Sequence, residues 1–262
     1  MCTVSVGIDA GSQCLKAVVL CGGVIIGEHM LPIGTNAIEQ MGFVCVTTAI
    51  EKAGISKDAV ECVTATGVGR EFIGFANKTV SEVLCTVSGV DWMSLPTDIV
   101  LDMGSDKTTA IKYSHGKPTK VLRNDRCASG TGRFLDVAAK PLALTADELG
   151  ELSIKSTKQL IMNSTCAVFA ESEVISLIHK KEKPEDIAKS IFDSMASRVH
   201  ALLLKIGAEG NIAMIGGLAK NRGMVKAIED VTGLHVLITQ AADPQMVTAL
   251  GASLIGREQP TG

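Results

Sequence analysis

Short apolar segments separated by glycine turns open the chain. Three of them occupy residues 3–33, and their alternation is typical of an antiparallel three-stranded meander. A helix capped by Asn36 and closed by Gly54 should follow, then a strand at Val60–Thr66. A second helix is expected from about Ser81 to Val90. The first half therefore predicts the order β-β-β-α-β-α.

The second half repeats this order. Its first strand, Asp98–Asp102, ends in Asp-Met-Gly-Ser, as the opening strand ends in Asp-Ala-Gly-Ser, and two more strand-like segments follow. Helices are then expected at 133–140, from the capping-box match at 145–148, from 166 to 180, and from Pro184 to near Gly207. A strand at 211–215, a helix to about 232, a strand at 235–239 and a helix at 245–255 complete the pattern. The repeat predicts two domains, residues 1–95 and 96–262, with the last helix able to pack back on the first domain.

Composition excludes several classes. Of 262 residues, 46% are hydrophobic and 20% charged, with a net charge of −3 and a mean hydropathy of +0.30, which disfavours disorder. Six Phe, one Trp and one Tyr without a basic excess disfavour nucleic-acid binding. The best apolar run is too short to span a membrane. We expect a cytoplasmic protein without a leader, whose eight cysteines stay reduced.

The two Asp-x-Gly-Ser corners are the first candidate chemistry. A tight corner exposes backbone N–H groups that can hold phosphate oxygens, and glycine lets the backbone approach closely. Asp9 and Asp102 would end equivalent strands and could hold a hydrated Mg²⁺. The Gly216-Gly217 corner suits a base or ribose. An ordinary turn remains the alternative for each corner taken alone, but no Walker or complete Rossmann motif competes with this interpretation.

These three corners, in this order, make the chain resemble the actin-like ATPase and sugar-kinase superfamily. The resemblance extends over nearly the full length of the chain. The resemblance implies an α/β fold of two duplicated βββαβαβα domains with nucleotide in the cleft between them. The residues that would contact nucleotide or take part in catalysis are, in the first corner, Asp9, Gly11, Ser12, Gln13 and Lys16; in the second, Asp102, Gly104 and Ser105; and in the adenosine segment, Gly216, Gly217 and Ala219.

Cys127 and Cys166 differ from the other cysteines because each lies just ahead of a predicted helix. A helix N-terminus favours a thiolate, and Arg126 beside Cys127 acts in the same direction. Their spacing does not indicate a metal site, so a structural role remains open from the residues alone. A [4Fe–4S] cluster takes four cysteines, which a symmetric dimer of this chain could supply.

The segments 127–136 and 164–176, with Ala65–Arg70, are very similar to the ATPase activators of 2-hydroxyacyl-CoA dehydratases and the related benzoyl-CoA reductase ATPase subunits. The resemblance implies an oxygen-sensitive homodimer with one [4Fe–4S] cluster held by Cys127 and Cys166. ATP hydrolysis with Mg²⁺ would drive electrons from ferredoxin or flavodoxin to an iron–sulfur enzyme: a dehydratase, a benzoyl-CoA reductase-like enzyme or a double-cubane-cluster protein. Further nucleotide contacts would be Gly130, Thr131, Gly132 and Gln245.

One departure from this family concerns the second corner. The usual pattern is D-I-G-G-Q-D-x-K, whereas this chain has Asp106 in place of the glutamine and Thr109 in place of the lysine. Asp106 could orient water, act as a base or cap the turn. Two other functions stay open: a small-molecule kinase of the same fold, and a nucleotide-controlled iron–sulfur sensor that passes no electrons.

Overall fold

A computed structural model describes residues 2–34, 37–124, 131–162 and 167–257. These residues form two compact units. Unit 1 consists of residues 1–95, 113–118 and 239–262, and unit 2 consists of residues 96–112 and 119–238. Each unit is described by itself below.

Unit 1 is built on a five-stranded sheet of order β3-β2-β1-β4-β5. Its strands are β1 (Val4–Ala10), β2 (Cys14–Cys21), β3 (Val24–Pro32), β4 (Cys62–Thr66) and β5 (Lys78–Thr79). β1 pairs antiparallel with β2 and parallel with β4, which confirms the predicted meander. β5 was not predicted, because two residues are too few to show a hydrophobic pattern. Between β4 and β5 the chain makes a short 3-10 turn, Arg70–Phe72.

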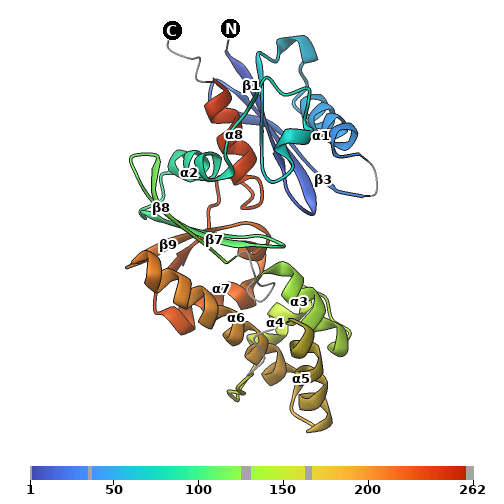
Figure 1. Ribbon diagram of the computed structural model, residues 1–262, viewed down its shortest axis with the longest axis vertical. Coiled ribbons are helices and arrows are strands. Elements are labelled where there is room, and N and C mark those ends of the chain that lie inside the picture. Colours follow the sequence, from blue (N-terminus) through green and yellow to red (C-terminus); the bar gives the residue numbers. More distant parts are fainter. Residues whose placement is uncertain (1, 35–36, 125–130, 163–166, 258–262) are drawn as a thin grey trace. The chain divides into compact units, whose positions relative to one another are not determined.

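Helices cover both faces of this sheet (Figure 1). α1 (Ile38–Lys52) packs on one face, and α2 (Glu82–Trp92) and α8 (Val247–Arg257) lie on the other. Successive residues of β2 show the division: Val19 belongs to the core under α1, and Val18 and Leu20 belong to the core under α8. Gly7 lets α8 approach, because a Cβ there would collide with the Ala249 carbonyl.

Unit 2 repeats the sheet with the order β10-β9-β6-β7-β8. The strands of this second sheet are β6 (Ile99–Met103), β7 (Thr108–Ser114), β8 (Lys117–Asn124), β9 (Asn211–Ile215) and β10 (His235–Leu237), and only the β7–β8 turn region, residues 113–118, is grouped with unit 1. β6 pairs antiparallel with β7 and parallel with β9, as β1 does with β2 and β4. The predicted internal repeat is therefore confirmed in strand order and strand direction.

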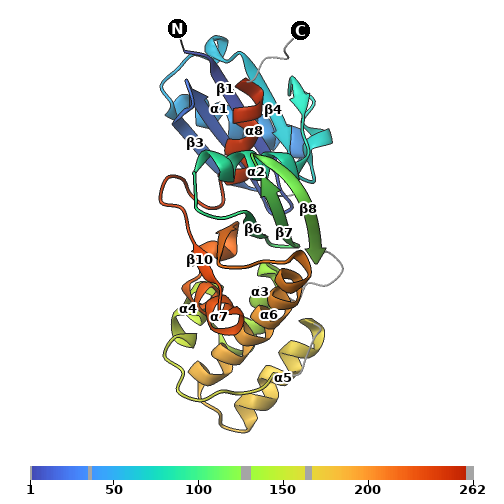
Figure 2. The ribbon, with the colours of Figure 1, turned by 90° about the vertical axis from the view of Figure 1, so that its left-hand side faces the viewer.

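Helices make up most of the rest of unit 2 (Figure 2). They are α3 (Gly132–Ala139), α4 (Ala146–Ser153), α5 (Ala167–His179), α6 (Pro184–Ile206) and α7 (Arg222–Thr232). A single hydrophobic cluster joins them to β6 and β9, and Phe134 and Phe192 are its largest buried side chains. The burial of these apolar faces, more than helix propensity, stabilises the short helices.

Several predicted helix ends are confirmed. Thr145 and Glu148 form the capping box of α4, Pro184 occupies the first turn of α6, and Gly207 ends α6 in the left-handed conformation. The expected cap Asn36 lies outside the described residues. α1 begins at Ile38, and its N-cap residue Ala37 makes no side-chain cap hydrogen bond.

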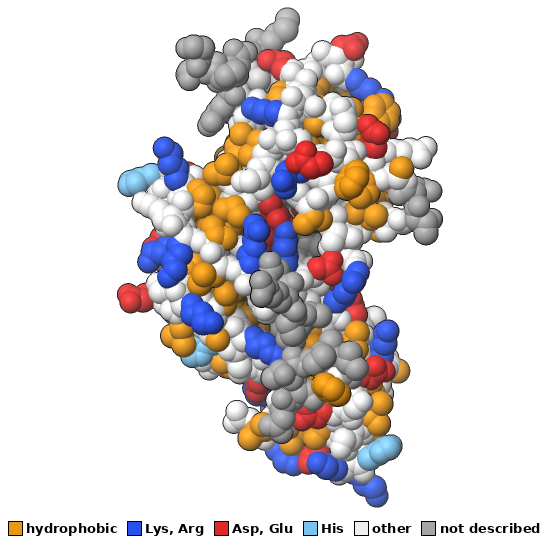
Figure 3. Space-filling view, in the orientation of Figure 1, with side chains coloured by type: hydrophobic (Ala, Val, Ile, Leu, Met, Phe, Trp, Pro, Cys, Tyr) orange, Lys and Arg blue, Asp and Glu red, His pale blue; other side chains and the backbone are white. Residues whose placement is uncertain are grey.

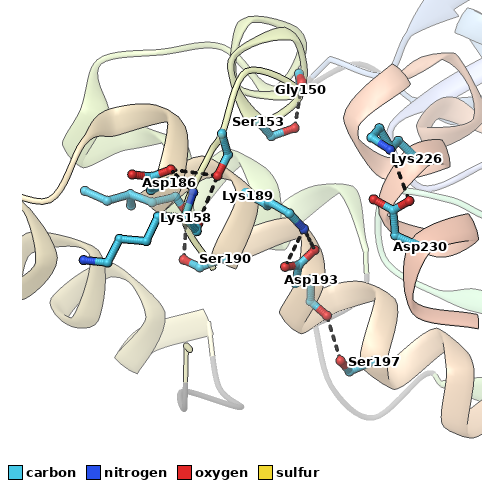
Figure 4. Close-up of polar contacts among 12 residues, drawn as sticks. Gly150, Ser153, Lys158, Asp186, Lys189, Ser190, Asp193, Ser197, Lys226 and Asp230 are labelled. Atoms are coloured by element: carbon cyan, nitrogen blue, oxygen red, sulfur yellow. Dashed lines mark hydrogen bonds and ion pairs between the residues drawn. The ribbon is translucent and has the colours of Figure 1, made fainter. Parts of the chain in front are cut away.

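Buried Asp186 in α6 fixes the connection that follows α4 (Figure 4). Its carboxylate accepts the Ser156 hydroxyl at 2.7 Å and the backbone N–H groups of Thr157 and Lys158 at 3.1 and 3.0 Å. The hydrogen bond from Ser156, more than any other contact, lowers the pKa of Asp186. This aspartate therefore has a structural role in holding α4 and α6 together.

Cys2 and Cys21 are joined by a disulfide, so the expectation that all cysteines stay reduced is wrong for this pair. The register of β1 against β2 explains this pairing, because it places Val4 opposite Cys21. Cys2 lies two residues before Val4, and its Cα is 5.6 Å from the Cα of Cys21, within the range of a disulfide.

Acidic and basic side chains are interspersed over the face shown in Figure 3. Over the ranges the structure describes, every helix is too short or too polar to cross a membrane.

Candidate functional site

The first corner contains a buried carboxylate at the end of a central strand. Asp9 is the sixth residue of β1 and is only 4% exposed. Its Oδ2 accepts a hydrogen bond from Lys16 Nζ at 2.9 Å, because Lys16 lies opposite Asp9 in β2. Its Oδ1 has no hydrogen-bond partner among the described residues. An unpaired buried carboxylate oxygen is costly and indicates a ligand that completes it.

The backbone at Gly67 lies close to the Asp9 carboxylate. It follows β4, whose last residue Thr66 is in register with Asp9, and it has a positive φ of +89°. A Cβ on Gly67 would collide with Asp9 Oδ1, and no other residue type combines this conformation with such an approach. Arg70 closes the same turn by donating from Nη1 to the Gly67 carbonyl at 3.1 Å.

The second corner repeats this arrangement. Asp102 is the fourth residue of β6, in register with Ile215 of β9, and Gly216 follows that strand. Gly216 has φ +86°, and a Cβ there would lie 2.5 Å from the Met103 carbonyl oxygen and 2.9 Å from Asp102 Oδ1. Gly216 is thus the counterpart of Gly67. Gly67 was not among the predicted site residues, because its equivalence to Gly216 rests on the pairing of β4 with β1 and of β9 with β6.

The loops that follow the two aspartates are tight turns. Gly11 N–H donates to the Cys14 carbonyl at 3.1 Å, which leaves Ser12 and Gln13 exposed at the turn. Gly104 N–H donates to the Lys107 carbonyl at 3.0 Å, and Ser105 is half-buried. These are the compact glycine corners that the sequence predicts, and backbone N–H groups in such a turn can donate hydrogen bonds to phosphate oxygens.

The remaining predicted nucleotide residues occupy different elements. Gly217 begins the 3-10 turn Gly217–Lys220, in which Ala219 is buried. Thr131 is fully buried as the N-cap residue of α3, and Gly132 is the first residue of that helix. Gln245 lies in unit 1, just before α8, and its N–H donates to Asp243 Oδ1 at 2.9 Å.

Cys127, Cys166 and Gly130 lie outside the described residues. The helices predicted to follow the two cysteines are present: α3 begins at Gly132, and α5 begins at Ala167, directly after Cys166. α3 and α5 pack against each other. In the part of the chain that the structure describes, no three His, Cys, Asp or Glu side chains are grouped to hold a metal ion.

Cys45 and Cys85 are buried thiols of a different kind. Burial raises the pKa of Cys45 to about 12 and that of Cys85 to about 11. Both side chains belong to the interior of unit 1, where cysteine packs as a small hydrophobic residue. They are therefore poor candidates for metal ligands.

We expect iodoacetamide at pH 8 to leave Cys45 and Cys85 unmodified in the folded protein. A pKa of about 12 leaves about one thiol in 10⁴ as the reactive thiolate at that pH. Mass spectrometry of tryptic peptides should detect modification of both only after unfolding in urea. The half-buried Cys62 provides the comparison. Modification of Cys45 in the folded state as fast as that of Cys62 would contradict the assigned burial.

Comparison with known proteins supplies the family context for these corners. Residues 6–256 match the BadF/BadG/BcrA/BcrD ATPase family. The 2-hydroxyisocaproyl-CoA dehydratase activator of Clostridioides difficile is 36% identical over 252 residues, which cover 95% of this chain and 93% of that protein. The (R)-2-hydroxyglutaryl-CoA dehydratase activating ATPase of Acidaminococcus fermentans is also 36% identical over 252 residues, with 95% of each chain covered.

Two solved structures extend the similarity to the fold. Component A of the Acidaminococcus fermentans (R)-2-hydroxyglutaryl-CoA dehydratase matches with a TM-score of 0.92 at 36% identity, covering 97% of this chain and 98% of that one. The activator of the 2-hydroxyisocaproyl-CoA dehydratase from Clostridium difficile, with bound ADPNP, matches with a TM-score of 0.90 at 34% identity, covering 97% and 94%. The predicted class, a duplicated actin-like ATPase fold, is confirmed.

Proposed function

The chain belongs to the BadF/BadG/BcrA/BcrD ATPase family, and from this premise we propose that it hydrolyses ATP to deliver single electrons to an iron–sulfur partner enzyme. The observation that carries the proposal is the repeated corner, in which a carboxylate at a strand end faces a glycine of positive φ. The solved structure of a similar activator contains bound ADPNP.

The residues of the corners fit a nucleotide with its magnesium ion. Asp9 Oδ1 is buried and, within the described ranges, without a hydrogen-bond partner, which suits water molecules bound to Mg²⁺. The Lys16 ammonium group forms an ion pair with the other oxygen of this carboxylate, Oδ2. Asp102 would supply a second carboxylate for hydrated Mg²⁺. Gly11, Gly104 and their neighbours would bind phosphate through backbone N–H groups. Gly216, Gly217 and Ala219 would hold the nucleoside.

Cys127 and Cys166 would hold a [4Fe–4S] cluster shared by two copies of the chain. The donor chemistry fits, since two thiols per chain give a homodimer the four ligands that such a cluster takes. The packing of α3 against α5 supports a common site, because each helix directly follows one of the two cysteine segments. When bound, the cluster supplies reversible one-electron transfer at low potential.

The names of the relatives support the choice of partner. The two relatives described above are named as activators of 2-hydroxyacyl-CoA dehydratases. We propose that this chain activates an iron–sulfur dehydratase or a related reductase, with ferredoxin or flavodoxin as the electron source and a cytoplasmic site of action. A small-molecule kinase would share the fold but would have no use for the paired cysteine segments.

Iron analysis of protein prepared without oxygen tests this proposal. We expect about four iron atoms per homodimer, because one [4Fe–4S] cluster should be shared by two chains. Cys127→Ser and Cys166→Ser should each lose most of the iron. Cys62→Ser replaces a half-buried cysteine of β4 and is the matched control, which should keep it. Equal iron in all four proteins, or none in the unsubstituted protein, would overturn the cluster assignment.

A further inference from the structure

The loop of the second corner is joined to the first turn of α3 by three consecutive residues. Gly104 and Ser105 accept through their carbonyls the N–H groups of Gly132 and Arg133, at 3.0 and 3.1 Å. The side chain of Asp106 then pairs with Arg133, with Oδ1 3.0 Å from Nε. The first N–H groups of a helix have no partner within the helix, so this loop acts as the cap of α3.

The environment of Asp106 does not fit a carboxylate that orients or deprotonates a water molecule. One of its oxygens already pairs with the Arg133 guanidinium, and its side chain is 34% exposed, whereas Asp9 is buried with an open oxygen. The Asp106–Arg133 pair is exposed and contributes little stability by itself. Because the two backbone hydrogen bonds already bring the loop and the helix together, the pair can determine how the first turn of α3 is oriented.

α3 is well suited to transmit a movement of this loop. Phe134 and Leu135 follow Arg133 and are fully buried, so that the first turn cannot shift without the core around it. The helix packs against α5, and Cys127 precedes it by five residues in the sequence. A change at Gly104–Asp106 would thus reach both helices that follow the cysteine segments.

We infer that Asp106 is a positioning residue which, through Arg133, couples nucleotide binding at the second corner to the first turn of α3. The inference rests on the proposed function, since it requires a nucleotide at this loop. Asp106 is thereby assigned to an ion pair with Arg133 rather than to the turn cap that the sequence left open, because the carbonyls of Gly104 and Ser105 form the cap of α3. The steps of phosphoryl transfer do not depend on it.

Hydrogen exchange of residues 132–135, measured with and without ADPNP, tests the coupling. In the unsubstituted protein we expect ADPNP to slow exchange there by about threefold or more. Asp106→Asn should abolish most of this difference, and Asp106→Glu, which can still pair with Arg133, should restore it. Asp136→Asn, which alters an exposed carboxylate of the same helix, is the matched control and should behave like the unsubstituted protein.

The ATPase rate separates positioning from catalysis. The inference expects kcat of Asp106→Asn within about threefold of the starting value, whereas loss of a general base would lower it about 10²-fold or more. A 10²-fold loss, or an unchanged exchange response in Asp106→Asn, would overturn the inference while the proposed function stands. If ADPNP binds the unsubstituted protein without any response in α3, the inference also fails. If ADPNP does not bind at all, the proposed function itself fails.

Discussion

Replacing Asp9 by asparagine should lower the kcat of ATP hydrolysis by about 10²–10³-fold, the usual cost of losing one preorganised electrostatic contact. The substituted amide would keep the shape of the side chain but lose the charge that Lys16 compensates and that hydrated Mg²⁺ would require. Phosphate release at saturating ATP and Mg²⁺ measures kcat, and titration with a fluorescent nucleotide reports binding separately.

Asp58→Asn is the matched control for this substitution. Asp58 is an exposed aspartate of unit 1 in the 3-10 turn Lys57–Ala59, and its replacement should leave kcat unchanged. Circular dichroism should show that both variants are folded. A kcat for Asp9→Asn within about threefold of the starting value would remove Asp9 from the catalytic site and leave its open oxygen unexplained.

Gly216→Ala should weaken nucleotide binding by about tenfold or more, because a misplaced backbone loses well-oriented contacts. The backbone at Gly216, with φ +86° and ψ −178°, lies in a region that is essentially restricted to glycine. The added methyl would also lie 2.5 Å from the Met103 carbonyl oxygen, so the corner beside Asp102 would have to open. Isothermal titration with ADPNP measures the effect.

Gly233→Ala provides the comparison within the same unit. Gly233 also has a positive φ, +69°, but a Cβ there would meet no atom within 4 Å. Alanine in the left-handed region costs about 1–2 kcal/mol of stability wherever it occurs. Gly233→Ala should therefore lower the unfolding temperature and leave nucleotide affinity unchanged. Equal affinities for Gly216→Ala and Gly233→Ala would contradict the role of Gly216 in the site.

Hydrophobic alternation, glycine turns and the repeated Asp-x-Gly-Ser corner made the fold predictable from the sequence. The repeat correctly placed Asp9 and Asp102 at equivalent strand ends, because β1 and β6 occupy the same position in their sheets. The family resemblance drawn from the motifs at 65–70, 127–136 and 164–176 is confirmed by the family match. The Asp-x-Gly-Ser corners and the family motifs could be recognised because each consists of residues that are close together in the chain.

The features that were missed depend on residues brought together only by folding. Arg133 follows Asp106 by 27 positions, so their pairing could not be read from local sequence. The disulfide between Cys2 and Cys21 depends on the register of β1 against β2. Gly67 has its role because β4 lies beside β1 and ends opposite Asp9. Such contacts depend on strand register and backbone conformation, which the local sequence does not specify.

Nucleotide-dependent reduction of an iron–sulfur acceptor tests the central claim most directly. The protein, prepared without oxygen and reduced with dithionite, is mixed with a 2-hydroxyacyl-CoA dehydratase of a related system, and the oxidation state of each iron–sulfur protein is followed by electron paramagnetic resonance. We expect the acceptor to be reduced with ATP and Mg²⁺, but not without nucleotide or with ATP added to Asp9→Asn. Reduction at equal rates with and without ATP, or none although the cluster is present and ATP is hydrolysed, would contradict the account.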